Sequence, residues 1–202
     1  MRHPTKDSEP VPRSEPPYRL GRLGGVAAEL GLLAVSALLF ALSFPSFLSR
    51  WGFFPLAFVA LAPVFWVVHR AGWGRVVLYG AFYGYLSYAL HNYWLGSFHP
   101  LTLVIVPPIY AVYLLAVFPL LKAADRLYPR YGFVVQSLVW VGYEFLKVQG
   151  FLAYSYGVLG YTQYLFLPLA RLAALTGVWG VSLLVVLPSA WVGNALREGP
   201  AG

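Results

Sequence analysis

The sequence predicts an all-α integral membrane protein, a bundle of about six transmembrane helices with an aromatic loop at the membrane interface. Of its 202 residues, 59% are hydrophobic and only 10% are charged, and the mean hydropathy is +0.67, which is unlike a soluble domain. The charged residues separate six apolar segments, each near the roughly 20 residues that a helix needs to cross a bilayer. There is no cysteine, which excludes disulfides, thiolate metal sites and a cysteine nucleophile.

The sequence predicts a transmembrane domain with a tail on either side. Residues 1–22 are rich in proline and charge and are predicted to form a disordered cytoplasmic tail, because they offer little apolar surface to bury. A transmembrane domain is predicted over 23–195, with a short tail at 196–202. Its first span, 23–44, is read as an uncleaved anchor, in which a structural role is favoured for Glu29. The second span, 53–69, is short and either crosses with little tilt or ends in the interface.

The third span, 76–95, has Gly80 and Gly84 four residues apart, a spacing that lets helices approach closely. Its polar end is expected to line a cavity or the outer interface. A metal site is not expected there, because no second ligand stands three or four residues from the histidine. The expected cavity-lining residues are Tyr88, His91, Asn92 and Trp94.

The fourth span, 101–121, contains Pro107 and Pro108, which are expected to kink or break it. The following segment, 122–131, carries Lys122, Asp125 and two arginines and is predicted to be an aqueous loop.

The fifth span, 132–148, carries a polar stripe. Gln136, Trp140, Glu144 and Lys147 follow at steps of four, four and three, so a helix aligns them on one side. Ionisable groups inside an apolar span mark a functional site by default. The alternative is a neighbouring ion pair of Glu144 and Lys147, with the lysine reaching up to the interface.

Between the fifth span and the sixth, 176–195, lie residues that suit the lipid head-group layer. The loop is rich in tyrosine, and aromatic rings of this kind prefer the membrane interface. Residues 165–175 are expected to form a short amphipathic helix on the membrane, with Arg171 toward phosphates. Eleven of the fourteen Lys and Arg residues fall on the side of both termini, so the positive-inside rule predicts cytoplasmic termini and an outward-facing aromatic loop. These basic residues are scattered, which argues against nucleic-acid binding.

Several motifs in order resemble one family. The motifs are LSFP at 42–45, PLA at 55–57, the stretch 80–94, WxxxEFL at 140–146, GYTQ at 160–163, PLA at 168–170 and GVWGVS at 177–182. Together they resemble the membrane half of bacterial apolipoprotein N-acyltransferases over about 24–195. The resemblance implies a multi-pass protein of the bacterial inner membrane that handles phospholipid and lipoprotein acyl chains. In that family, catalysis uses a Glu-Lys-Cys triad in a nitrilase-like domain, and no such triad can be placed on this cysteine-free sequence.

The expected function is therefore the membrane-embedded part of an N-acyltransferase system, with catalysis supplied by a separate nitrilase-like subunit; no catalytic residue, metal or cofactor is assigned here. The alternatives are an inactive truncated remnant, a small transporter, or a scaffold that binds another membrane protein through Gly80, Gly84 and 177–180. An acid–base pair of His91 and Glu144 would require the third and fifth spans to touch. The expected lipid-binding residues are Trp140, Glu144, Tyr161, Gln163 and Arg171; the structural alternative gives Trp140 a packing role and has Tyr161 and Gln163 cap the loop.

Overall fold

The computed structural model describes residues 18–150 and 153–198, and every regular element within these ranges is helical. The elements in chain order are α1 (Tyr18–Ser43), the 3₁₀ helix η1 (Phe54–Leu56), α2 (Ala57–Ala60), α3 (Ala62–Arg70), α4 (Trp73–His91), the 3₁₀ helix η2 (Tyr93–Ser97), α5 (Leu101–Leu127), α6 (Gly132–Lys147), the 3₁₀ helix η3 (Leu159–Leu165) and α7 (Leu167–Glu198).

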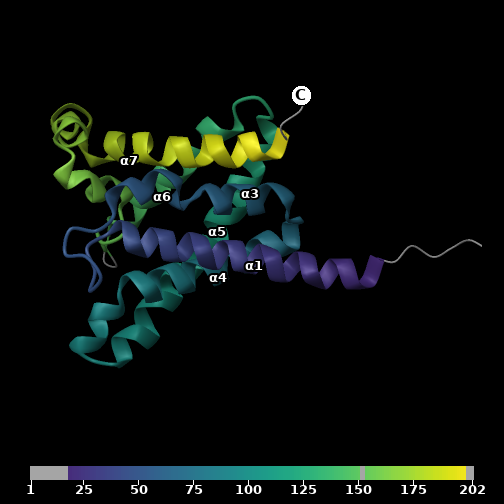
Figure 1. Ribbon diagram of the computed structural model, residues 1–202, viewed down its shortest axis with the longest axis horizontal. Coiled ribbons are helices and arrows are strands. Elements are labelled where there is room, and N and C mark those ends of the chain that lie inside the picture. The colour runs from purple at the N-terminus through teal and green to yellow at the C-terminus, as the bar shows by residue number, and fades with distance from the viewer. Residues whose placement is uncertain (1–17, 151–152, 199–202) are drawn as a thin grey trace, which may run out of the picture.

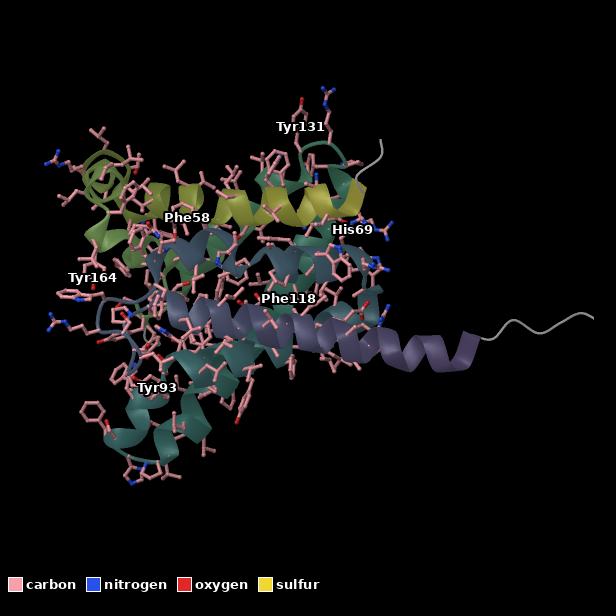
Figure 2. All side chains as sticks on the ribbon, in the orientation of Figure 1. Phe58, His69, Tyr93, Phe118, Tyr131 and Tyr164 are labelled. Carbon is pink, nitrogen blue, oxygen red and sulfur yellow. The ribbon has the colours of Figure 1, made fainter. Side chains whose placement is uncertain are left out.

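The chain runs back and forth between two ends of one bundle (Figure 1). Figure 2 places His69 and Tyr131 at one end, Tyr93 and Tyr164 at the other, and Phe118 between them. We call these the basic end and the loop end. The start of α1 and the finish of α7 both lie at the basic end (Figure 1).

Three helices are long and apolar enough to cross a membrane, over Gly25–Ser43, Leu101–Leu127 and Leu167–Leu196, and a shorter apolar segment covers Phe54–Arg70. The predicted all-α membrane bundle is confirmed. Helices α3, α4 and α6 pack among the long ones (Figure 1).

The bundle core joins side chains from every long helix and from α3, α4 and α6. Gly80 and Gly84 lie where α4 meets α5: a Cβ on Gly84 would stand 2.8 Å from the backbone of Tyr110 and Ala111, and one on Gly80 would overlap the carbonyl of Leu114. The predicted close approach is therefore confirmed. The core includes Leu33, Phe40, Val64, Phe65, Tyr79, Tyr83, Leu114, Phe118, Leu121, Trp140, Tyr143, Val185 and Val186.

The helical domain is longer at both ends than the predicted 23–195. Helix α1 begins at Tyr18, inside the segment predicted to be a disordered tail. No proline follows Pro17 before Pro45 in the sequence, and a nucleated helix extends at little cost until proline stops it. Helix α7 likewise continues to Glu198, beyond the predicted boundary at 195. The rest of the two predicted tails, 1–17 and 199–202, lies outside the described residues.

The prediction of an aqueous loop at 122–131 is wrong for residues 122–127, because α5 continues to Leu127. Lys122 is fully buried, and its Nζ donates to the carbonyls of Val68 and His69 at 2.9 and 2.5 Å. Asp125 is buried and pairs with the ring of His69 at 2.9 Å. The lysine thus satisfies carbonyls that the end of α3 leaves without helical partners.

The prolines at 107 and 108 do not break α5, which is continuous across them. Proline has a helical φ, and the missing hydrogen bonds are tolerated where neighbouring helices hold the segment. The beginning of α5, together with η2, projects away from the rest of the bundle at the loop end (Figure 1).

Helix α7 has two parts, because Gly177 interrupts it with φ 66° and ψ −178°. The part before Gly177 appears end-on in Figure 1, whereas the part after it lies along the bundle. This arrangement agrees with the prediction of a short helix at 165–175 followed by a span from 176.

Candidate functional site

The polar stripe of α6 lies on the packed face of that helix. Gln136, Trp140, Glu144 and Lys147 are all buried. Gln136 ties α6 to α5 through a bond from its Nε2 to the carbonyl of Leu121 at 3.2 Å. The predicted alignment is confirmed, and the side chains point into protein rather than into lipid.

Glu144 accepts hydrogen bonds from three elements. Its Oε1 accepts from the indole Nε1 of Trp140 at 3.2 Å and from the backbone N–H of Leu159 at 3.0 Å. Its Oε2 accepts from the hydroxyl of Ser182, whose Oγ in turn accepts from the N–H of Gly160 at 3.0 Å. The carboxylate therefore joins α6, the start of η3 and α7.

Lys147 is just as buried, and its Nζ donates to three oxygens. These are the hydroxyl of Tyr88 at 2.6 Å and the carbonyls of Tyr156 and Gly157 at 3.0 and 2.8 Å. The side chain does not reach up to the interface, so that alternative is wrong. Nor do Glu144 and Lys147 form an ion pair: neither belongs to the ion pairs found among the described residues, which include His69–Asp125 and Arg75–Glu29.

Together the two charged groups hold one turn of the outer loop, which we define as residues 153–166. The Lys147 ammonium donates to the carbonyls of Tyr156 and Gly157, just before Val158, and the Glu144 carboxylate accepts from the N–H just after Val158. Each charge therefore meets backbone dipoles of opposite sign. Gly157 has φ +78°, a conformation that side chains disfavour. A Cβ on Gly160 would stand 2.6 Å from the carbonyl of Val178, so the loop lies directly against α7.

An open cavity of about 460 Å³ lies at the loop end, on the outer side of this turn. It is formed where the end of α1, the end of α4 with η2, and the outer loop meet. Figure 2 shows Tyr164 and Tyr93 at this end of the bundle. The lining residues are Phe44, Pro45, His91, Trp94, Ser155, Tyr156, Gly157, Tyr161 and Tyr164. We call this the outer cavity.

The lining of the outer cavity is amphipathic and, among the residues that the structure describes, includes no Asp, Glu, Lys or Arg. Its polar groups are hydroxyls, an imidazole and backbone atoms. Behind the lining, the hydroxyl of Tyr154 donates to Oδ1 of Asn92 at 2.7 Å. Burial and, secondarily, the nearby Tyr156 raise the pKa of Tyr154 to about 12, so this donor keeps its proton at physiological pH. Such a lining suits the neutral ester and acyl parts of a lipid better than a bare phosphate.

The structure brings only some of the predicted residues to the cavity. His91, Trp94 and Tyr161 line it. Tyr88 and Asn92 are buried behind it, where Tyr88 stacks on Tyr110 with ring centroids 3.9 Å apart.

The remaining predicted lipid residues lie elsewhere. Trp140 and Glu144 are buried in packing and anchoring roles, and Gln163 is buried with its Nε2 donating to the carbonyl of Phe54 at 3.2 Å. Arg171 is exposed on α7 before the kink and is not part of the cavity lining. His91 is not among the hydrogen-bond partners of Glu144, so the proposed acid–base pair is not formed.

Several lining residues were missed from sequence. Phe44 and Pro45 were noted only within the LSFP motif at the end of the first predicted span, and their place in the lining depends on the segments that pack against that end. The loop was recognised as rich in tyrosine, but Tyr156 and Tyr164 were not assigned to a common site. The signal that could have joined them is Gly157, since glycine adopts the positive φ of a tight turn without steric cost.

The fold and the cavity define a class: a multi-pass helical membrane protein with a tyrosine-lined, amphipathic cavity at one end. The chain belongs to the apolipoprotein N-acyltransferase family, because the model of that family's N-terminal domain matches residues 36–191.

Individual relatives agree. Apolipoprotein N-acyltransferase 1 of Treponema denticola is 44% identical over 168 residues, which cover 83% of this chain and 31% of that protein. Its counterpart in Treponema pallidum is 47% identical over 157 residues, covering 78% and 28%. The enzyme of Geobacter metallireducens is 32% identical over 186 residues, covering 82% and 33%. The chain thus spans about a third of the length of these curated relatives.

Proposed function

We propose that the chain forms the membrane-embedded part of an apolipoprotein N-acyltransferase system and presents phospholipid and lipoprotein acyl chains in the outer cavity. The observation that carries the proposal is this cavity, which is open, amphipathic and lined by rings suited to the head-group layer. These 202 residues hold no cysteine; we propose that a separate nitrilase-like subunit, docked at the loop end, supplies the cysteine-based acyl transfer.

The proposed location is the bacterial inner membrane, with both termini in the cytoplasm and the outer loop on the other side. The positions of the basic residues support this orientation. Arg70, Arg75, Lys122 and Arg126 belong to or adjoin the basic end, where α1 begins and α7 finishes (Figure 1), as the positive-inside rule requires.

Two alternative functions have less support. A transporter needs a polar path through the bundle, but the space between the buried charges of the two ends is filled by apolar side chains such as Leu114 and Phe118. A scaffold that docks through Gly80 and Gly84 would need these glycines at the surface, and α5 already covers them.

Lipid binding by the purified chain tests the proposal. Native mass spectrometry in mild detergent is expected to find retained phospholipid. Trp94→Ala and Tyr161→Ala should reduce the retained fraction severalfold, because each removes a ring from the cavity lining. Tyr131→Ala, an exposed ring at the basic end, is the matched control and should change nothing. Equal retention by all three variants, with unchanged folding, would remove the outer cavity as the lipid site.

A pull-down from the native membrane tests the proposed partner. The tagged chain is expected to bring down a protein with a nitrilase-like domain in near-stoichiometric amount. Mixing the two should restore N-acylation of a diacylglyceryl-cysteine peptide. Recovery of lipids and chaperones alone would refute the separate-subunit arrangement and would favour an inactive remnant.

A further inference from the structure

A second and smaller cavity adjoins the outer cavity between the loop-end turns of α1 and α4. Its volume is about 150 Å³. Pro45 and His91 line both cavities, so the two are neighbours separated by these side chains. We call the smaller one the side groove; its lining is mostly apolar and includes Leu38, Ala41, Leu42, Phe47 and Leu90. Ser46 and Tyr93 also line it, and the Ser46 hydroxyl has no hydrogen-bond partner among the described residues.

The side groove is accessible from the lipid-facing surface of the bundle. Leu38, Phe47 and Leu48 line it and are 49%, 76% and 61% exposed. Leu38 belongs to the apolar segment Gly25–Ser43, which is long enough to cross a membrane, so its exposed side chain is expected to face lipid. A fatty acyl chain of a membrane lipid can therefore enter the groove from the side of the bundle, without passing through the mouth of the outer cavity.

His91 is the polar group at the junction. Its ring is 8% exposed and packs against Phe44 and Phe40, with centroids 4.4 and 5.8 Å away. Its Nε2 is buried and has no hydrogen-bond partner in the described part of the chain. The nearby Tyr88 hydroxyl is already bonded to Lys147 and Tyr143. A buried polar atom in an apolar site is costly unless it is paired, so a ligand at the junction would supply the missing partner.

We propose that the side groove holds one fatty acyl chain, and that the ester carbonyl oxygen of this chain accepts a hydrogen bond from His91 Nε2–H at the junction. The inference rests on the lipid-presenting function proposed above and assigns a position to one fatty acyl chain of the lipid. An apolar cavity of roughly 150 Å³ is large enough for benzene, so the groove takes about the first six carbons in single file. The glycerol and head group then lie in the uncharged outer cavity.

The proposal is tested by photolabelling the 202-residue protein in detergent. The probe is a phosphatidylethanolamine that carries a diazirine near the sixth carbon of one fatty acyl chain. Label is expected on residues 38–48 and 90–93, mapped by mass spectrometry of peptides. His91→Leu, which keeps apolar volume but removes the nitrogen, should reduce this label about fivefold, as expected for one lost hydrogen bond. His91→Gln, which keeps an N–H donor, should retain most of it.

A second test of the proposal blocks the side groove. Ala41→Trp should abolish the groove label, while Leu184→Trp, a bulky change at an exposed position of α7, should leave it unchanged. An acyl ester can come from phospholipid or from a diacylglyceryl lipopeptide, so unlabelled forms of both are used as competitors. Displacement by either identifies the source, and displacement by neither overturns the site.

The outcomes separate this inference from the proposed function. Label in the outer cavity that is lost with Trp94→Ala, but unaffected by Ala41→Trp and His91→Leu, would overturn the side groove and leave the function standing. No specific label at the loop end would overturn both.

Discussion

Replacing Glu144 tests whether the buried carboxylate holds the outer loop in place. In Glu144→Ala, the N–H of Leu159 and the indole N–H of Trp140 lose their acceptor. Each buried donor left without a partner costs about 1–3 kcal/mol, so the two together cost about 2–6 kcal/mol, a range that includes the cost of about 3–5 kcal/mol for breaking a buried charge pair. The hydroxyl of Ser182 can rotate toward another acceptor and adds little.

Glu144→Gln separates the hydrogen-bonding role from the charge. The amide oxygen can still accept from both N–H groups, and the amide nitrogen can donate to Ser182 Oγ. The expected loss is only about 1–2 kcal/mol, the difference between bonds to a charged and to a neutral acceptor.

Thermal unfolding in detergent and chymotrypsin cleavage at the loop tyrosines measure the two effects. Glu144→Ala should lower the melting temperature and speed cleavage within 153–166, whereas Glu144→Gln should do so only weakly. Gln136→Ala, on the same helix face but bonded to α5, is the control that loses stability without exposing the loop. Wild-type protease resistance in Glu144→Ala, or equal damage by Gln and Ala, would refute the anchoring role.

Three further predictions concern backbone space and pH. Gly157→Ala should speed loop cleavage, because φ +78° costs a side chain about 1–2 kcal/mol; Gly142→Ala, with open space around it, should not, and equal behaviour of the two would contradict the turn. Gly84→Leu should prevent recovery of monodisperse protein, because α5 backbone lies 2.8 Å from its Cβ position; normal gel filtration would show that the helices are not so close. Because the pKa of Tyr154 is about 12 when folded and 10.0 unperturbed, its contribution to stability is complete below pH 10 and is lost as pH rises toward 12; Tyr154→Phe should flatten this decline, and an unchanged pH profile would argue against the buried hydroxyl.

Local periodicity predicted which residues of α6 face inward, because helix geometry alone aligns Gln136, Trp140, Glu144 and Lys147. The partners of Glu144 were not predictable in the same way. Leu159 and Ser182 lie 15 and 38 positions away, and nothing local indicates that a loop amide and a helix hydroxyl meet one carboxylate. For this reason the interpretation of Glu144 as a lipid contact differs from the anchoring role that its bonds indicate.

Lys122 shows the same limit at the other end of the bundle. A lysine and an aspartate after an apolar span are typical of an aqueous loop, and only the position of the α3 carboxyl end, 53 and 54 residues earlier, explains their burial. The cavity was predictable as a region, from the aromatic loop and the polar end of 76–95. Its individual lining residues were not, because they depend on the turn at Gly157.

The anchoring of the turn around Val158 also bears on the order in which the protein is made. The loop follows α6 in the chain, but the N–H of Gly160 is bonded by Ser182, which is synthesised later and lies well inside α7. A ribosome delivers the chain from its N-terminus, so the walls contributed by α1 and α4 exist before the loop can be fixed. The outer cavity therefore takes the form described here only after α7 has been inserted, and nascent chains that stop before α7 would lack the bond that fixes the loop lining it.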